Sequence, residues 1–270
     1  MAAALSETRR HAHMAYAIGK NLPRLAPSPM GDESISLACY GPSLEDTWQN
    51  LKPPIISVSG AHDFLVKRGV IPTYHIDIDP RKHKLRHLQN PNDETIYLMA
   101  SVCHPWVWNM LKGRRVVMWH TISGKQTENW LSMFDPGSTL IYGGSAVGLA
   151  AIQVAGFIGY RHIEIHGMDG SFRDGKRHAG EHYGHKQEEV DHTADGKTFR
   201  TTKIMMNSNV ELMNVLHSFP VFCVFHGDGL VQSMVAESKK LPNASVVSDV
   251  EKTAKVRSAK YIEVATEKAA

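Results

Sequence analysis

The sequence predicts an α/β fold with a Rossmann-like, mostly parallel open sheet and helices on both of its faces. Strand-like and helix-like segments alternate along the chain, which is typical of parallel sheets built from βα units. Several strand-like segments are continuous apolar runs, as expected when helices cover both faces. Glycine and acidic residues follow several of these segments, at the sheet edge where α/β proteins bind ligands. The predicted strands are 34–40, 55–59, 73–77, 95–100, 115–119, 139–142, 162–166 and 221–225.

The predicted organisation has three parts, which are a helical lead-in over 1–30, a Rossmann-like domain over 31–236 and a tail or surface helix over 237–270. The lead-in contains a helix over 2–20 that Asn21 and Pro23 stop. The tail is rich in Lys, Glu, Ser and Ala, with few apolar residues. Within the domain, residues 170–203 lack strand or helix periodicity, and we interpret them as a lid loop beside an active site.

Composition narrows the classes of partner. The chain has 270 residues and a formal net charge of +3, which is too small to favour nucleic acid or an anionic membrane. No apolar run reaches the roughly 18 residues that a membrane span needs, so no span is expected. Histidine is frequent, with 16 residues, and would make the protein more positive in mild acid. The expected partners are small molecules, and a homo-oligomer is left open.

Cysteine usage predicts the compartment. Cys39, Cys103 and Cys223 are far apart, each lies in an apolar run, and none belongs to a Cys-x-x-Cys pair. This pattern argues against a disulfide framework or a structural zinc site and favours buried free thiols. Residues 1–26 contain no apolar core of signal-peptide length, because charged residues and histidines interrupt them. A reducing, cytoplasmic location is therefore predicted.

Two glycine turns follow predicted strands. In Gly41-Pro42-Ser43 the glycine allows close approach of a ligand, free backbone N–H groups suit a phosphate, and the serine is suited to cap the next helix. Gly143-Gly144-Ser145 precedes a helix of small residues, again with a serine in the capping position, and suits an anion or a ribose. This second turn matches neither a Walker A loop nor GxGxxG. A simple βα connection is the alternative interpretation of each turn.

Acidic residues follow two other predicted strands. Asp77 and Asp79 are two positions apart, so both point to the same side of an extended chain, and Pro80 ends the strand. Such a pair suits Mg²⁺, which takes one or two carboxylates plus substrate phosphates, or a ribose hydroxyl. Asp169 lies between two glycines after a strand and is placed to contact a ligand. Turn formation alone is the alternative explanation for each acidic motif.

Taken together, these motifs resemble the MptE-like family. The similar features are Gly41-Pro42-Ser43-Leu44, Asp77-x-Asp79-Pro80, Gly144-Ser145 with the small-residue helix after it, and Gly167-Met168-Asp169, within residues 34–229. This family includes archaeal 6-hydroxymethyl-dihydropterin diphosphokinases and bacterial motility-accessory proteins implicated in putting nonulosonic sugars on flagellin. The first loop is also similar to the nucleotide-binding loop of bacterial sialyltransferases, although Tyr40 stands here where those enzymes have Asn.

The resemblance implies a nucleotide bound across the strand ends. The residues implied in nucleotide binding are Gly41, Pro42, Ser43, Gly143, Gly144, Ser145 and Asp169. The acidic strand end with Asp77 and Asp79 is expected to hold Mg²⁺. The most concrete function is diphosphate transfer from ATP to a hydroxymethylpterin-like alcohol, in which catalysis is mainly positioning and charge neutralisation.

Two alternative functions stay open. A glycosyltransferase would use a CMP-activated nonulosonic sugar donor, and a histidine would deprotonate the acceptor hydroxyl. The candidate histidines are His178, His182 and His185, which lie in the predicted lid loop, and no family motif selects one of them. The other alternative is a non-catalytic nucleotide-binding protein that kept the fold and lost the reaction.

Overall fold

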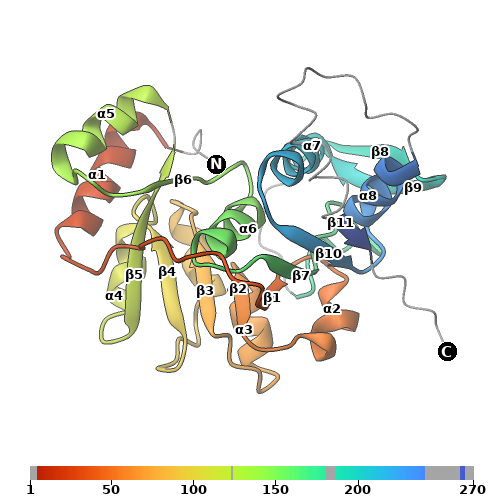
Figure 1. Cartoon of the computed structure of the whole chain (residues 1–270), viewed down its shortest axis with the longest axis horizontal. Coiled ribbons are helices and arrows are strands. Elements are labelled where there is room, and N and C mark those ends of the chain that lie inside the picture. The colour runs from red at the N-terminus through yellow and green to blue at the C-terminus, as the bar shows by residue number, and fades with distance from the viewer. Residues whose placement is uncertain (1–4, 123, 181–186, 241–261, 265–270) are drawn as a thin grey trace. The chain divides into compact units, whose positions relative to one another are not determined.

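The computed structural model describes residues 5–122, 124–180, 187–240 and 262–264 (Figure 1). The chain forms two compact units, which are described separately. Unit 1 comprises residues 1–29 and 53–159, and unit 2 comprises residues 30–52 and 160–270. Each unit contains parallel strands connected through helices, which confirms the predicted α/β, Rossmann-like fold.

The described part of unit 1 is built on five parallel strands in the order β2-β3-β4-β5-β6. Their bounds are β2 Ile55–Val58, β3 Tyr74–Asp77, β4 Ile96–Ala100, β5 Arg115–Ile122 and β6 Leu140–Tyr142. Each strand overlaps a predicted one, and β5 continues past its predicted end at Trp119. All residues of β2 are buried, as the continuous apolar run predicts for a strand covered on both faces.

Helices precede, connect and follow these strands along the chain. Their bounds are α1 Glu7–Ile18, α3 Ala61–Val66, η3 Lys82–His87, α4 Pro105–Met110, α5 Lys125–Phe134 and α6 Val147–Phe157. The first helix lies inside the predicted 2–20 helix and packs against α4 and α5. The helix α6 packs against β2, β3 and β6, and its small residues Gly148, Ala150 and Ala151 are buried. Small side chains at these positions let the helix approach the sheet closely.

Unit 2 contains a second set of parallel strands, in the order β11-β10-β7-β1 among its described residues. The bounds are β1 Ser34–Ala38, β7 His162–His166, β10 Phe222–His226 and β11 Ile262–Val264. The helices are α2 Leu44–Thr47, η2 Trp48–Asn50, α7 Lys203–Ser218 and α8 Leu230–Lys240. The strand β11 lies in the predicted tail, and α8 begins before that tail. The domain boundaries at residues 30 and 236 stay predictions.

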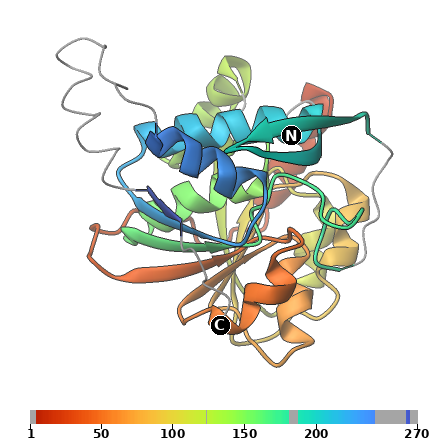
Figure 2. The ribbon, with the colours of Figure 1, turned by 90° about the vertical axis from the view of Figure 1, so that its right-hand side faces the viewer.

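Residues 170–203 contain a β hairpin that the sequence analysis does not predict. Strand β8, Glu189–Ala194, pairs antiparallel with β9, Lys197–Thr202, and the hairpin packs against α7 and α8 (Figure 2). Asp195 and Gly196 have φ values of 50° and 73°, as in a two-residue hairpin turn. The expectation of no strand here is wrong, because both strands are largely polar and their apolar periodicity is weak.

All three cysteines are free and buried, as predicted. Burial raises the pKa of the Cys39 and Cys223 thiols far above the usual range, so both stay protonated at neutral pH. None of the described helices is both long enough and apolar enough to cross a membrane. The cytoplasmic location stays a prediction.

Candidate functional site

In unit 2, Ser43 and Asp169 meet at the carboxyl ends of β1 and β7. The backbone N–H of Ser43 donates to Asp169 Oδ2 at 2.9 Å, and the Ser43 hydroxyl donates to Asp169 Oδ1 at 2.5 Å. Both residues are buried, with exposed fractions of 1% and 4%. Burial raises the pKa of Asp169 to about 6, although the hydrogen bonds from Ser43 act in the opposite direction. Such a pKa lies in the range that general acid–base chemistry at neutral pH requires.

Gly41 permits the close approach of these two loops. A Cβ atom at residue 41 would overlap the Asp169 carboxylate and lie 2.5 Å from the carbonyl oxygen of Gly167. The Gly41 N–H donates to that same oxygen at 2.7 Å, and Pro42 has no N–H. Together with the bond from Ser43 to Asp169, these contacts use the N–H groups of the turn. The expectation that this turn has free N–H groups for a phosphate is therefore wrong.

The two serines predicted as helix caps are arranged differently from that prediction. Ser43 precedes α2, but its hydroxyl donates to Asp169 and its side chain makes no capping bond. The helix α6 begins at Val147, later than predicted, and Ala146 in extended conformation takes the position that was expected for Ser145. The two turns therefore connect strand and helix in a different way from the one their sequences predict.

The second glycine turn, Gly143-Gly144-Ser145, follows β6 in unit 1. A Cβ atom on its first residue would overlap the side chain of Thr121. The second residue has a φ of 62°, a conformation that favours glycine. Both glycines are thus required by the local backbone and packing, and the nucleotide contacts expected for this turn stay a prediction.

Asp77 and Asp79 in unit 1 lie at the end of β3, as predicted, and both carboxylates accept hydrogen bonds from residues next to them in the sequence. Asp77 Oδ1 accepts the N–H groups of Ile78 at 2.7 Å and Asp79 at 2.8 Å. Asp79 accepts two hydrogen bonds from the Arg81 guanidinium, at 2.8 and 2.5 Å, and lies 3.7 Å from Lys84 Nζ. Burial, followed by the neighbouring Asp79 charge, raises the pKa of Asp77 to about 6. For Asp79, burial would raise the pKa, but the bond from Arg81 and the charge of Lys84 lower it.

These contacts determine what the pair offers to Mg²⁺. Asp77 Oδ2 accepts no hydrogen bond from the described residues, whereas Asp79 would have to exchange Arg81 for the metal. Among the residues that the structure describes, no group of three or more His, Cys, Asp or Glu side chains could hold a metal ion. The residues therefore fit a Mg²⁺ ion that substrate phosphates hold in the main, with Asp77 as its protein ligand.

Of the three candidate histidines, the structure places His178 beside the first glycine turn. Its Nδ1 lies 3.1 Å from the carbonyl oxygen of Tyr40, and its ring stacks on the Tyr40 ring with 5.3 Å between centroids. The N–H of Ala179 donates to the same carbonyl oxygen at 3.1 Å, which fixes the backbone next to the histidine. His182 and His185 lie outside the described residues.

A family model described as 6-hydroxymethylpterin diphosphokinase MptE-like matches residues 12–175. The chain belongs to the MptE-like family. The solved structure of a MAf glycosyltransferase from Magnetospirillum magneticum AMB-1 is similar to this MptE-like chain, with a TM-score of 0.64 and 17% sequence identity. The similarity covers 93% of this chain and 42% of that one, so this chain spans less than half the length of that protein. It shows a shared fold. A comparison with curated protein sequences finds no match.

The MptE-like chain also has a histidine pair that the sequence analysis missed. His166 and His226 are register partners at the ends of β7 and β10, and their rings stack with 4.1 Å between centroids. His226 Nε2 lies 2.5 Å from Glu164 Oε2, whereas the buried His166 Nδ1 has no hydrogen-bond partner among the described residues. Burial and the neighbouring His226 lower the pKa of His166 to about 3. A His-Gly dipeptide at the end of both strands was the available sequence signal.

Proposed function

We propose that this MptE-like chain is a nucleotide-dependent transferase, and most concretely that it transfers a diphosphate from ATP to a hydroxymethylpterin-like alcohol. The observation that carries the proposal is the family match, whose description is 6-hydroxymethylpterin diphosphokinase MptE-like. The matched residues 12–175 include both glycine turns and the three strand-end aspartates Asp77, Asp79 and Asp169. The residues proposed to contact the nucleotide are Gly41, Pro42, Ser43, Gly143, Gly144, Ser145 and Asp169.

In this reaction the acceptor oxygen bonds to the β-phosphorus of ATP while the bond from that phosphorus to the α,β-bridging oxygen breaks. AMP leaves, and the acceptor hydroxyl gives its proton to a base. Asp169 is the proposed base, because a pKa of about 6 leaves its carboxylate mainly ionised at neutral pH yet able to take a proton. Asp77 would hold Mg²⁺, which when bound offsets the negative charge of phosphate oxygens.

A glycosyltransferase that uses a CMP-activated nonulosonic sugar is the second candidate, and the position of His178 favours it. This histidine stacks on Tyr40, directly before the first glycine turn. In this reaction the acceptor oxygen bonds to the anomeric carbon of the sugar, the bond from that carbon to the phosphate oxygen breaks, and CMP leaves. His178 would take the acceptor proton. The fold that the chain shares with a MAf glycosyltransferase also supports this alternative.

The test is nucleotide turnover by the full chain. With ATP, Mg²⁺ and 6-hydroxymethyl-dihydropterin, we expect AMP release that depends on the pterin. Asp169→Asn should reduce the rate by at least about 100-fold, as loss of a general base does, whereas the exposed Asp32→Asn should not change it.

Other outcomes separate the alternatives. CMP release from a CMP-linked nonulosonic donor, lost in His178→Gln, would support glycosyl transfer instead of diphosphate transfer. Thermal stabilisation by ATP or by a CMP-linked nonulosonic donor, without release of AMP or CMP when both kinds of acceptor are present, would contradict both transferase proposals. That result would support a non-catalytic nucleotide-binding protein.

A further inference from the structure

The segment 81–87 of unit 1, which includes η3, is strongly basic. It carries four cationic side chains and two histidines and contains no acidic residue: Arg81, Lys82, His83, Lys84, Leu85, Arg86 and His87. Asp79, just before the segment, is the carboxylate that pairs with Arg81 and Lys84. Burial, and after it the charge of Arg81, lowers the pKa of His83, whereas the charge of Asp79 acts in the opposite direction. An anion is the ligand that such a segment suits.

Both ends of this basic segment are held in place. At its start, Asp79 accepts the backbone N–H of Arg81 at 3.0 Å in addition to the two guanidinium bonds. Just beyond its end, Asp63 of α3 accepts the N–H groups of Gln89 at 2.7 Å and Asn90 at 3.2 Å. Two carboxylates thus fix the backbone on either side of η3, so its cations are presented from a preorganised segment.

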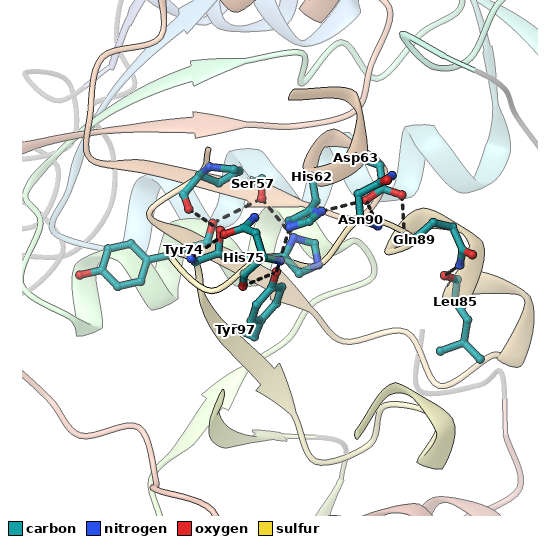
Figure 3. A network of polar contacts seen from close by, with 12 residues as sticks. Ser57, His62, Asp63, Tyr74, His75, Leu85, Gln89, Asn90 and Tyr97 are labelled. Carbon is teal, nitrogen blue, oxygen red and sulfur yellow. Dashed lines mark hydrogen bonds and ion pairs between the residues drawn. The ribbon is translucent and has the colours of Figure 1, made fainter. Parts of the chain in front are cut away.

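Figure 3 shows the polar network that holds Asp63 itself. His62 Nδ1 lies 2.9 Å from Asp63 Oδ1, and His62 Nε2 lies 3.2 Å from the hydroxyl of Tyr97 in β4. His75 of β3 packs edge-on against the His62 ring and contacts the hydroxyl of Ser57 at 3.1 Å. His62 and His75 are almost completely buried, so this network anchors the end of the basic segment to the sheet of unit 1.

An exposed tryptophan lies beside the same segment. Trp106 is the second residue of α4, which packs against η3, and 53% of its surface is exposed. Lys82 Nζ lies over the Trp106 ring, 3.6 Å from the ring centroid, which is a cation–π distance. Trp108, by contrast, is only 5% exposed and packs in the core. An exposed indole beside a cation is a platform on which a planar ring can stack.

We propose that Arg81, Lys82, Lys84 and Trp106, which we call the η3 surface, bind the phosphates and the base of the nucleotide donor. This proposal rests on the proposed function. The residues of the two glycine turns carry no positive charge, and the N–H groups of Gly41 and Ser43 bond within the chain. The donor phosphates therefore need cations from elsewhere, and Arg and Lys side chains bind phosphate oxygens strongly.

A mononucleotide fits this surface better than a nucleic acid. The surface has one exposed indole and a short run of cations, with Asp77 and Asp79 directly before it. The net charge of the whole chain is only +3. A nucleic-acid site needs a row of cations and stacking rings along many phosphates. The chemistry matches a ligand with one ring and a few phosphates.

The test is equilibrium binding of ATP, adenosine and tripolyphosphate to the full chain by isothermal titration calorimetry. Trp106→Ala should weaken ATP and adenosine binding roughly tenfold, as loss of a base-stacking contact does, and leave tripolyphosphate binding unchanged. Lys82→Gln should weaken ATP and tripolyphosphate binding roughly tenfold. Two matched controls lie on exposed positions of the same unit, Phe134→Ala and Lys112→Gln, and neither should change binding.

The positioning role of the network has its own test. Asp63→Asn should weaken tripolyphosphate binding less than Lys82→Gln does. Because the network is buried, this variant is used only if its circular dichroism and thermal unfolding show a folded protein. Lys82→Gln and Trp106→Ala change exposed side chains and carry the test in any case.

Several results would overturn the inference. One is an ATP affinity that stays unchanged in both Trp106→Ala and Lys82→Gln. Another is a single-stranded RNA 12-mer that binds wild type more tightly than ATP does and whose binding is lost in the same two variants. Turnover distinguishes this failure from that of the proposed function. Normal AMP release with unchanged ATP affinity in both variants would refute the η3 surface alone. ATP binding that depends on the η3 surface, without any turnover, would refute the transferase alone.

Discussion

Replacing Asp169 by asparagine should make the protein more stable at neutral pH while it removes the proposed catalytic base. Asparagine has the same shape as aspartate and can still accept the N–H of Ser43, but it carries no charge. In the folded chain burial raises the pKa of Asp169 from its ordinary 3.8 to about 6. The ionised carboxylate is therefore disfavoured by folding, and the variant removes that cost.

The magnitude follows from the shift in pKa. Between these two values the folded state binds more protons than the unfolded state, so the contribution of Asp169 to stability falls as the pH rises. A difference of about 2 units between the folded and unfolded pKa values corresponds to roughly 3 kcal/mol over the whole pH range. Between about pH 5 and about pH 7 the change is roughly 1 kcal/mol. The histidines also titrate in this range, but they do so in both wild type and Asp169→Asn, so their contribution cancels in the difference.

Urea unfolding measures this change. Fluorescence of the five tryptophans would follow unfolding of wild type and Asp169→Asn at several pH values. The free energy of unfolding of the variant, relative to wild type, should increase by roughly 1 kcal/mol from about pH 5 to about pH 7. Asp32→Asn, at a side chain that is 89% exposed, is the control and should show no such trend. A difference between wild type and Asp169→Asn that does not vary with pH would refute the argument.

Three further predictions concern stability and are measured by the same urea titrations. Gly41→Ala should destabilise the chain by about 1–3 kcal/mol, because its new Cβ would lie 2.5 Å from a backbone carbonyl oxygen. The control Gly19→Ala, whose new Cβ would have its nearest atom at 3.4 Å, should change stability little, and equal effects of the two variants would contradict the packing argument. Lowering the pH from about 7 to about 5 should reduce the stability of wild type by roughly 2 kcal/mol through His166, since a pKa of about 3 keeps this side chain neutral in the folded state while it takes a proton in the unfolded state. His166→Gln should lack this pH-dependent loss, and a pH dependence of stability equal to that of wild type would refute the prediction. Thr202→Ala should cost about 1 kcal/mol, because the Thr202 hydroxyl caps α7, and an effect near zero would show that the cap is not needed.

Strands that are buried on both faces were predictable from their sequence. The apolar runs that form β2 and β4 are buried almost throughout, so hydrophobicity along the sequence marks them directly. The hairpin of β8 and β9 was missed for the opposite reason. Its strands are largely polar and mostly exposed or half-buried, and the Asp195-Gly196 turn is its main signal.

The candidate site was predictable in its positions and much less in its contacts. Asp77, Asp79 and Asp169 lie at strand ends as expected, because a strand followed by a turn is a local pattern. Their partners could not be predicted. Local sequence suggested Ser43 as a helix cap, but in the structure its hydroxyl donates to the carboxylate of Asp169 and makes no capping bond.

The sequence by itself determined the order of the parallel strands along the chain, the buried state of its three cysteines and the family motifs at the strand ends. All of these depend on neighbouring residues, whose hydrophobicity and turn chemistry act locally. Only the tertiary structure decided that Ser43 pairs with Asp169, 126 residues away, and that His166 stacks on His226. Such pairs depend on strand register and on which loops the sheet brings together, and no local pattern in the chain records that distance.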